Sequence, residues 1–260
     1  MRITVLEKVY GPYRPEDFTP AFLSLCQGLE VDVRVVGTAG RGWLVVEVEG
    51  EDEEVALRLL EEEMGLAPAR LDALGRFSTI RGRVLAVRED GLLVDIGVFE
   101  PFNLDALVPA GVLRAQLADG LDIGVEELAS LFCLMEGLPL EVKLLEGPGG
   151  VEGRPVPAML SEAQVRALEA WVLSGLDRVV VTCASHHVVR RAIRGPGLHR
   201  LVVDIERLGL LENCVVLKLG APASDIIRSI RRRSADARTC VFRPGRIMSR
   251  FPGRFTRSAF

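Results

Sequence analysis

The sequence predicts an α+β protein in which a central five-stranded β-barrel lies between two ferredoxin-like modules. The order of strand-like and helix-like segments is βαββα at the start of the chain and βαββαβ near its end, which is the split-βαβ, ferredoxin-like pattern. Between them, five short strand-like segments with a helical insertion after the third are typical of a small Greek-key barrel. With 260 residues and 48% hydrophobic side chains, the chain can bury a core in each module.

Residues 1–70 form the first predicted module. Its strands alternate apolar and polar side chains, and a glycine-rich turn joins two of them as a hairpin. Its second helix begins with acidic side chains, which suit the positive end of the helix macrodipole. The expected elements are a strand at Ile3–Val9, a helix from Pro15 to Gly28, strands at Val31–Val36 and Trp43–Val48, and a helix from Glu51 to Gly65.

Residues 71–160 form the predicted barrel with its helical insertion. Asp90-Gly91 is a typical two-residue hairpin turn between its first two strands. The expected strands are Thr79–Arg88, Leu92–Gly97, Asp105–Pro109, Pro139–Glu146 and Arg154–Leu160, and the inserted helices are Val112–Leu117 and Val125–Met135.

Residues 161–243 form the second predicted ferredoxin-like module, which opens with a helix that starts at the capping sequence Ser161-Glu162-Ala163-Gln164. An arginine-rich tail, residues 244–260, follows it. The expected strands are Arg178–Cys183, Arg200–Ile205, Cys214–Leu219 and Arg238–Phe242, and the helices are Ser185–Ile193 and Ala221–Ile230.

The barrel segment resembles the S1 RNA-binding domain. The resemblance rests on Gly82-Arg83-Val84, Gly91-Leu92-Leu93-Val94-Asp95-Ile96-Gly97, Leu107-Val108-Pro109 and Leu140-Glu141-Val142-Lys143. It implies an S1/OB-like barrel that binds RNA on one face, where aromatic side chains stack on bases and basic side chains contact phosphates. Leu93 departs from the family, which has an aromatic residue at this position. The barrel is therefore expected to bind RNA weakly or to contact a protein instead.

The whole chain also resembles an archaeal family of proteins of unknown function, the domain of unknown function 2110. This second resemblance rests on the barrel motifs together with Ile205-Glu206-Arg207-Leu208-Gly209-Leu210-Leu211-Glu212 and Val215-Val216-Leu217-Lys218-Leu219-Gly220. It implies an archaeal source and the three-part architecture, and it implies nothing specific about activity.

The net charge of −4 conceals a strong asymmetry along the chain. Residues 1–70 and 71–160 each carry seven basic and fourteen acidic side chains, whereas residues 161–260 carry eighteen basic and eight acidic ones. Of the basic residues 29 are arginine, whose planar guanidinium binds phosphate in a bidentate manner. Such asymmetry favours a polyanionic partner, although a genome that prefers arginine explains the excess equally well.

The tail and the preceding helix concentrate this charge. Ten arginines and one acid lie between Arg228 and Phe260, interleaved with Phe242, Phe251 and Phe255 and interrupted by proline and glycine. An arginine triplet at a helix C-terminus is also favoured by the macrodipole. The five arginines beyond it are typical of an arm that becomes ordered on RNA.

Neither a metal site, a cofactor nor a disulfide framework is expected. The five cysteines are scattered in apolar contexts and form no CxxC pair, so they are interpreted as small buried side chains. Cys183-Ala184-Ser185-His186-His187 is the one cluster with catalytic residue types. Because no Asp, Glu or Asn has an evident role in orienting its histidines, Cys183 is expected to be buried and Ser185 to cap a helix.

These patterns predict a non-catalytic, cytoplasmic RNA-binding protein of the archaeal translation or ribosome-associated machinery. The alternative is a protein interaction module whose barrel has lost its RNA face and which docks onto RNA polymerase or a translation factor. No apolar segment is long enough for a membrane span, and the N-terminus lacks a signal-peptide pattern. The expected RNA-binding residues are Phe77, Arg81, Arg83, Arg88, Phe99, Lys143, Arg231, Arg232, Arg233, Arg243, Arg246, Arg250, Arg254 and Arg257.

Overall fold

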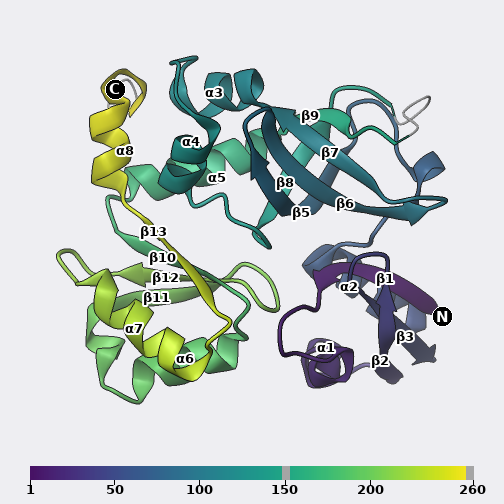
Figure 1. Ribbon diagram of the computed structural model, residues 1–260. Coiled ribbons are helices and arrows are strands. Elements are labelled where there is room, and N and C mark those ends of the chain that lie inside the picture. The colour runs from purple at the N-terminus through teal and green to yellow at the C-terminus, as the bar shows by residue number, and fades with distance from the viewer. Residues whose placement is uncertain (148–152, 256–260) are drawn as a thin grey trace.

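The computed structural model describes residues 1–147 and 153–255 and has three parts (Figure 1). In this view the N-terminal part lies beneath the barrel, and the C-terminal module lies next to the N-terminal part, beneath the inserted helices and α5. The prediction of a mixed α+β fold around a five-stranded barrel is confirmed. No helix in the described ranges is both long and apolar enough to cross a membrane.

The N-terminal part is a three-stranded antiparallel sheet, in the order β1-β3-β2, covered by two helices. Its core contains Phe18, Phe22, Val46 and Leu60, which come from the helical segments and the central strand. After the last helix the chain returns to β1, where Val5 and Leu66 form an antiparallel bridge. The elements are β1 (Arg2–Lys8), a 3₁₀ turn (Pro15–Phe18), α1 (Thr19–Leu25), β2 (Val31–Ala39), β3 (Trp43–Gly50) and α2 (Glu53–Met64).

The central part is a closed barrel in which β5, β6, β7, β9 and β8 follow one another and β8 pairs again with β5. The β7–β9 pair is parallel, and the other barrel pairs are antiparallel. The elements are β4 (Ala69–Arg70), a 3₁₀ turn (Leu71–Ala73), β5 (Thr79–Arg88), β6 (Gly91–Glu100), β7 (Leu104–Pro109), α3 (Ala110–Ala118), α4 (Val125–Phe132), β8 (Pro139–Leu144), β9 (Val156–Leu160) and α5 (Glu162–Leu173).

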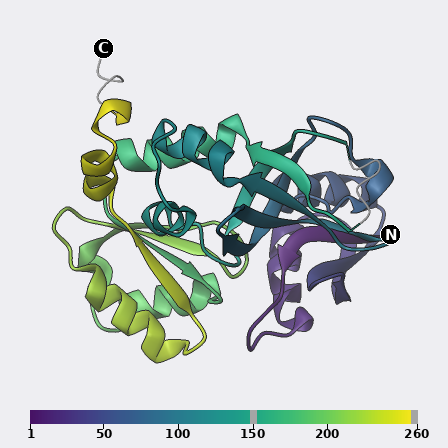
Figure 2. The same ribbon diagram turned by 45° about the horizontal axis from the view of Figure 1, so that its top comes forward.

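The C-terminal module is a four-stranded antiparallel sheet in the order β11-β12-β10-β13. Val180 and Phe242 on one face of this sheet join the barrel core, whereas Val179 and Val181 on the other face pack under two helices. Those helices, α6 and α7, therefore lie on the side turned away from the barrel (Figure 2). The elements are β10 (Arg178–Thr182), α6 (His186–Arg194), a 3₁₀ turn (Leu198–Leu201), β11 (Val202–Arg207), β12 (Asn213–Leu217), α7 (Ala223–Arg233) and β13 (Arg238–Phe242).

The tail is not an extended arm over its described residues. It folds into α8 (Pro244–Arg250) and α9 (Pro252–Phe255), and α8 packs against α5 (Figure 1). Ile247 and Phe251 are buried in the barrel core, so the aromatic side chain at 251 is not available to stack on bases. The prediction of an arm was wrong because these apolar side chains recur at i and i+4, the helical spacing that buries one face.

A disulfide links Cys133, which follows α4, to Cys240 of β13. The expectation that all five cysteines are isolated buried side chains is therefore wrong for this pair, and correct for Cys26, Cys183 and Cys214. The two bonded cysteines are 107 positions apart, so no local spacing could indicate the bond. It joins the barrel part to the C-terminal module.

A buried ionic cluster joins all three parts. Arg83 of β5 donates to Oε2 of Glu7 in β1 at 2.5 Å and to Oε2 of Glu212, just before β12, at 2.8 Å. The hydroxyl of Tyr10 donates to Glu212, and the backbone N–H of Leu210 donates to Glu7 at 3.0 Å. Arg83, Glu7 and Glu212 are 1–3% exposed, so this cluster is solvent-free. Arg83, which was predicted to contact RNA, is therefore not part of an exposed face, and its guanidinium neutralises two internal carboxylates.

The electrostatics of the cluster follow from its burial. Burial lowers the pKa of Arg83, but the carboxylates of Glu212 and Glu7 outweigh this effect, so the pKa lies above the usual value. Burial raises the pKa of Glu212, and the nearby Arg83 only partly opposes that shift. The guanidinium is therefore the fixed positive centre around which the carboxylates are held.

We expect Arg83→Met to lower the free energy of unfolding by about 3–5 kcal/mol, because it leaves two buried carboxylates without their cation. Urea denaturation monitored by circular dichroism measures this change. Arg88→Met is the matched control, because Arg88 forms a half-exposed pair with Asp90, and its effect should stay below about 1 kcal/mol. Equal effects of the two substitutions would contradict a structural role for the cluster.

Candidate functional site

The most basic surface of the described structure lies on α6 and α7. The two helices pack against each other, and Ser229 Oγ donates to the carbonyl of Ala192 at 2.6 Å across their contact. Val189 and Ile193 of α6 and Ile226 and Ile230 of α7 face the sheet, which turns the intervening arginines outward. We call these exposed side chains the basic face: Arg190, Arg191, Arg194, Arg228, Arg231, Arg232 and Arg233.

The charge of the basic face is largely uncompensated. Arg228 lies 3.8 Å from Asp225, which is the only carboxylate on either helix. Within residues 1–147 and 153–255, the other six arginines have no ion-pair partner. Arg233 of α7 also reaches the end of α6, where Gly195 follows the last helical residue. A Cβ atom built on Gly195 would be only 2.8 Å from Nη2 of Arg233. Two helices thus combine into one cationic surface.

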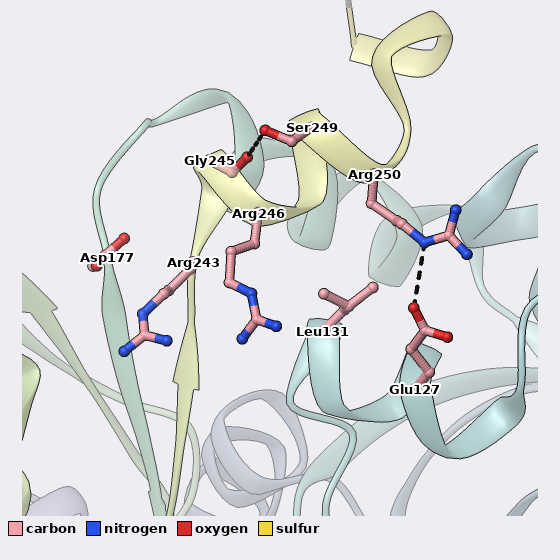
Figure 3. A pocket seen from close by; sticks show the side chains of 8 residues that line it. All are labelled: Glu127, Leu131, Asp177, Arg243, Gly245, Arg246, Ser249 and Arg250. Carbon is pink, nitrogen blue, oxygen red and sulfur yellow. Dashed lines mark hydrogen bonds and ion pairs between the residues drawn. The ribbon is translucent and has the colours of Figure 1, made fainter.

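A groove beside α8 adds further positive charge. Arg246 extends toward Leu131 of α4, Arg243 lies on the side of Asp177, and Ser249 and Arg250 form the α8 side (Figure 3). Arg250 contacts Glu127 at 3.3 Å, whereas Arg243 and Arg246 have no ion-pair partner in the described ranges. These two arginines are therefore available to an anion.

Other tail arginines are neutralised by the chain itself. Arg254 is only 12% exposed and donates to Asp119 at 2.8 Å and to Glu169 at 2.6 Å. Arg250 has the contact to Glu127 described above. Acids of the barrel part thus hold the side chains of Arg250 and Arg254, both of which were predicted to contact RNA. Arg257 lies outside the described residues.

One aromatic side chain of the barrel remains exposed among cations. Phe77, just before β5, is 52% exposed. The guanidinium of Arg76 and the ammonium of Lys143 lie 4.6 Å and 5.6 Å from the centre of its ring. Phe77 and Lys143 are therefore brought together, as a small stacking surface at one end of the barrel.

The remaining barrel residues of the predicted site are engaged elsewhere. Half-buried Arg81 donates to the carbonyl of Leu208 in the C-terminal module, and burial lowers its pKa. Arg88 pairs with Asp90 at the hairpin turn. Arg81 therefore contributes to an interface between parts of the chain, and Arg88 is separated from it at the other end of β5.

The N-terminal part covers the outer side of β6 and β7. Nε1 of Trp43 donates to Asp95 at 3.2 Å, Lys8 pairs with the same carboxylate, and Arg41 donates to Asp105 at 2.6 Å. Phe99 lies under the β2–β3 turn, where a Cβ atom at Gly40 would be 3.0 Å from it. Phe99, which was predicted to stack on RNA, is therefore partly covered by this turn.

The Cys183–His187 cluster does not form a catalytic triad. Cys183 is buried, and its sulfur points toward the N-terminal part, since a Cβ atom at Gly11 would lie 2.3 Å from Sγ. Ser185 is the residue before α6, as expected, but its side chain makes no capping hydrogen bond. His186, however, does have an orienting partner, because its Nδ1 lies 2.9 Å from Oδ1 of Asn213. Sequence reasoning missed this partner, which is 27 positions away.

The His186–Asn213 contact fixes one histidine at the edge of the basic face. The side-chain amide of Asn213 donates to the carbonyl of Ala184 at 2.8 Å, so its oxygen faces the imidazole. This arrangement makes Nδ1 of His186 the protonated nitrogen of the neutral ring. His186, Arg190, Arg194 and His199 line a shallow pocket beside β11.

Three family models match the chain. They are the DUF2110 N-terminal domain over residues 2–69, the DUF2110 central domain over residues 76–172, and the DUF2110 C-terminal domain over residues 176–240. Together they span most of the sequence. The chain belongs to the DUF2110 family. The family resemblance seen in the sequence is thereby confirmed. No curated protein matches the chain.

The family's C-terminal domain contains every arginine of the basic face. Sequence reasoning found Arg231, Arg232 and Arg233 and missed Arg190, Arg191, Arg194 and Arg228. The signal was present, because the arginines alternate with apolar residues at helical spacing in both segments. The arginines of the two segments could be recognised as one surface only when α6 was known to lie beside α7.

We expect the His186–Asn213 contact to make folding sensitive to mild acid. Burial lowers the pKa of His186 below 6.5, and the hydrogen bond to Asn213 only partly offsets the shift. The contribution of neutral His186 to the free energy of unfolding is fully present above pH 6.5, and it is lost as the pH falls through the lowered pKa. His186→Gln should therefore reduce the dependence of unfolding free energy on pH between about 7 and 5.

Urea denaturation at stepped pH measures this dependence. His187→Gln is the matched control, since His187 is the exposed neighbour in the same helical turn, and it should keep the slope of the unaltered protein. An unchanged slope for His186→Gln would exclude His186 as the source of acid sensitivity.

Proposed function

We propose that this DUF2110 protein is a non-catalytic RNA-binding protein whose main contact surface is the basic face of α6 and α7. The observation that carries this proposal is the gathering of seven exposed arginines, six of them without an ion-pair partner in the described ranges, on two adjacent helices. The proposed target is ribosomal or other structured RNA of the gene-expression machinery, in the cytoplasm.

The choice of arginine supports a phosphate-bearing partner. A guanidinium donates through two parallel N–H groups to phosphate oxygens, and it also stacks on exposed bases. A rigid helical surface holds such groups at fixed positions, which suits the regular spacing of phosphates along a folded RNA. Neutralising several phosphates releases condensed counterions, so affinity should fall steeply as salt rises.

We further propose that the central barrel is S1/OB-like and that the flanking parts are ferredoxin-like. The barrel topology supports the S1/OB-like assignment, because the strands follow the order β5-β6-β7-β9-β8 around the closed barrel. The third and fifth barrel strands, β7 and β9, are parallel neighbours. In support of the ferredoxin-like assignment, the C-terminal sheet order β11-β12-β10-β13 is that of a split-βαβ unit, and the N-terminal sheet β1-β3-β2 is three-quarters of one.

In this proposal the barrel contributes less to RNA binding than the helices do. Its β6–β7 side is covered by Trp43, Lys8 and Arg41 of the N-terminal part. Phe77 and Lys143 at the end of the barrel remain for a stacking contact. Leu93, which replaces the aromatic residue of the S1 pattern, is consistent with a barrel whose usual binding face is used internally.

A second candidate function is protein docking through the acidic helix α2. The exposed acids Glu54, Glu61, Glu62 and Glu63 have no ion-pair partner in the described ranges, so they form a free negative surface. This surface suits a basic protein partner, such as a component of RNA polymerase or a translation factor. An affinity pull-down with and without nuclease separates the two functions, because RNA-mediated partners are lost after nuclease treatment.

We expect the triple substitution of Arg191, Arg194 and Arg232 by Gln to weaken binding to a structured RNA by about ten-fold or more near 0.1 M salt. The slope of log affinity against log salt should become shallower by about two to three, because each removed phosphate contact contributes about 0.7–0.9. Filter binding at four salt concentrations measures both quantities.

The control is the triple substitution of Arg34, Arg58 and Arg70 by Gln. It removes the same charge from exposed positions in the N-terminal part and its linker, and should leave the slope unchanged. Equal losses in the two triple variants would show that only net charge matters. Salt-independent or absent binding by the unaltered protein would exclude RNA binding through this face.

A further inference from the structure

A cavity lies at the junction of the three parts of the molecule. It has a volume of about 560 Å³, within the usual range for small-molecule pockets. Lys8 and Tyr10 line it from the N-terminal part, Arg83 and Val84 from the barrel, and Cys183 from the C-terminal module. Because each part supplies one wall, the cavity exists only in the assembled fold.

Polar groups without partners lie in or beside this cavity. Nε of Arg83 is buried and has no hydrogen-bond partner within the described residues, and the same holds for Oγ1 of Thr182. Arg83 and Gly137 both line the cavity. Thr182 lies next to Gly137, because a Cβ atom built on Gly137 would be 3.7 Å from the Cβ atom of Thr182. A buried donor left unsatisfied costs about 1–3 kcal/mol, so native proteins rarely keep one without a ligand or water.

The mouth of the cavity is formed by the loop after α7. Ala235, Asp236 and Arg238 line it, and Arg238 pairs with Glu136 from the barrel part. Asp236 is exposed and has no ion-pair partner in the described ranges. The lining thus combines the cationic side chains of Lys8 and Arg83 and the exposed carboxylate of Asp236 with the apolar side chains of Val84 and Leu85.

This combination suits a flat, neutral ring with donors and acceptors on its edge. A free phosphate is disfavoured, because the cations of the lining, Lys8, Arg83 and Arg238, are each already paired with a carboxylate, and Asp236 adds an unpaired negative charge. A nucleobase carries no charge, presents acceptors to an N–H donor and amino groups to a carboxylate, and fits the volume. Ring faces also pack on apolar side chains.

The mouth is continuous with the basic face. Arg231, Arg232 and Arg233 end α7, and the mouth begins two positions later at Ala235. Arg231 donates to Oγ1 of Thr239 at 3.2 Å, so the arginine triplet is tied to the strand that follows the loop. A nucleic acid held by these arginines would pass directly over the cavity.

We propose that the cavity binds a single unpaired nucleobase, which an RNA held on the basic face inserts past Ala235. This inference rests on the proposed RNA-binding function. The arginines would supply sequence-independent affinity from phosphates, and the cavity would supply the preference for an RNA with an unstacked base, as in other proteins that read extruded bases.

The test uses the full chain and two hairpin RNAs of equal length, one fully paired in its stem and one with a single bulged 2-aminopurine. The variant is Ala235→Trp, which fills the mouth from an exposed position and leaves the buried ionic cluster intact. The control is Ala115→Trp at an exposed position on α3, away from the cavity. Circular dichroism melting checks that both variants fold.

The unaltered protein and the control should bind the bulged RNA about five- to ten-fold more tightly than the paired RNA and should change the 2-aminopurine fluorescence. Ala235→Trp should bind the two RNAs equally, with an unchanged salt slope and no fluorescence change. If the unaltered protein binds both RNAs equally with no fluorescence change, the inference is overturned while the proposed RNA-binding function stands.

A separate titration with free adenosine, guanosine, cytidine and uridine distinguishes the source of the base. Nucleoside binding that Ala235→Trp abolishes would support a nucleobase site even if no RNA binds, in which case the proposed function fails and the cavity takes free nucleosides. Absence of both nucleoside binding and a response from the bulged RNA overturns the site itself.

Discussion

The placement of the three parts depends on one buried cation. Arg83 extends from the barrel wall to carboxylates of both flanking parts, Glu7 and Glu212. Removing these three ions from water costs several kcal/mol for each, and only close, hydrogen-bonded geometry offsets that cost. A small displacement of either flanking part would leave a charge without a partner in a solvent-free interior. The cluster therefore defines the relative positions more strictly than an apolar contact, which tolerates sliding.

This placement decides which surfaces are available to a partner. With the N-terminal part held against β6 and β7, that side of the barrel is internal. With the C-terminal sheet packed on the barrel, only its helical side remains outside, and that side carries the arginines. The cavity is a consequence of the same arrangement, because Arg83 both joins the parts and leaves one N–H group unsatisfied at their junction.

The distribution of acidic side chains also decides which arginines are neutralised within the molecule. The inserted helices and α5 supply Asp119, Glu127 and Glu169, which neutralise two tail arginines. Asp204 lies in a pocket with Arg190 and Arg194 of α6 but forms no ion pair with them in the described ranges. Positive charge in the last hundred residues is thus divided between an internal, structural use near α8 and α9 and an external surface on the two helices. The second surface, together with Arg243 and Arg246 beside α8, is free to attract a polyanion at long range.

The sequence by itself determined the order of the elements, the closed barrel and the family. Alternating apolar residues, the Asp90-Gly91 turn and helical spacing are local signals, so strands such as Thr79–Arg88 were predicted with their observed bounds. Local spacing also predicted α6 and α7 as helices, although only three of the seven arginines of the basic face were assigned.

The tertiary structure alone decided what each charge does. Arg83, Arg250 and Arg254 look like any other arginine in the sequence, yet their partners lie 76 to 135 positions away. The same holds for the disulfide between Cys133 and Cys240 and for the pairing of His186 with Asn213. Whether a guanidinium is free for a ligand depends on its desolvation and its neighbours in space, and neither quantity is encoded in the residues beside it in the chain.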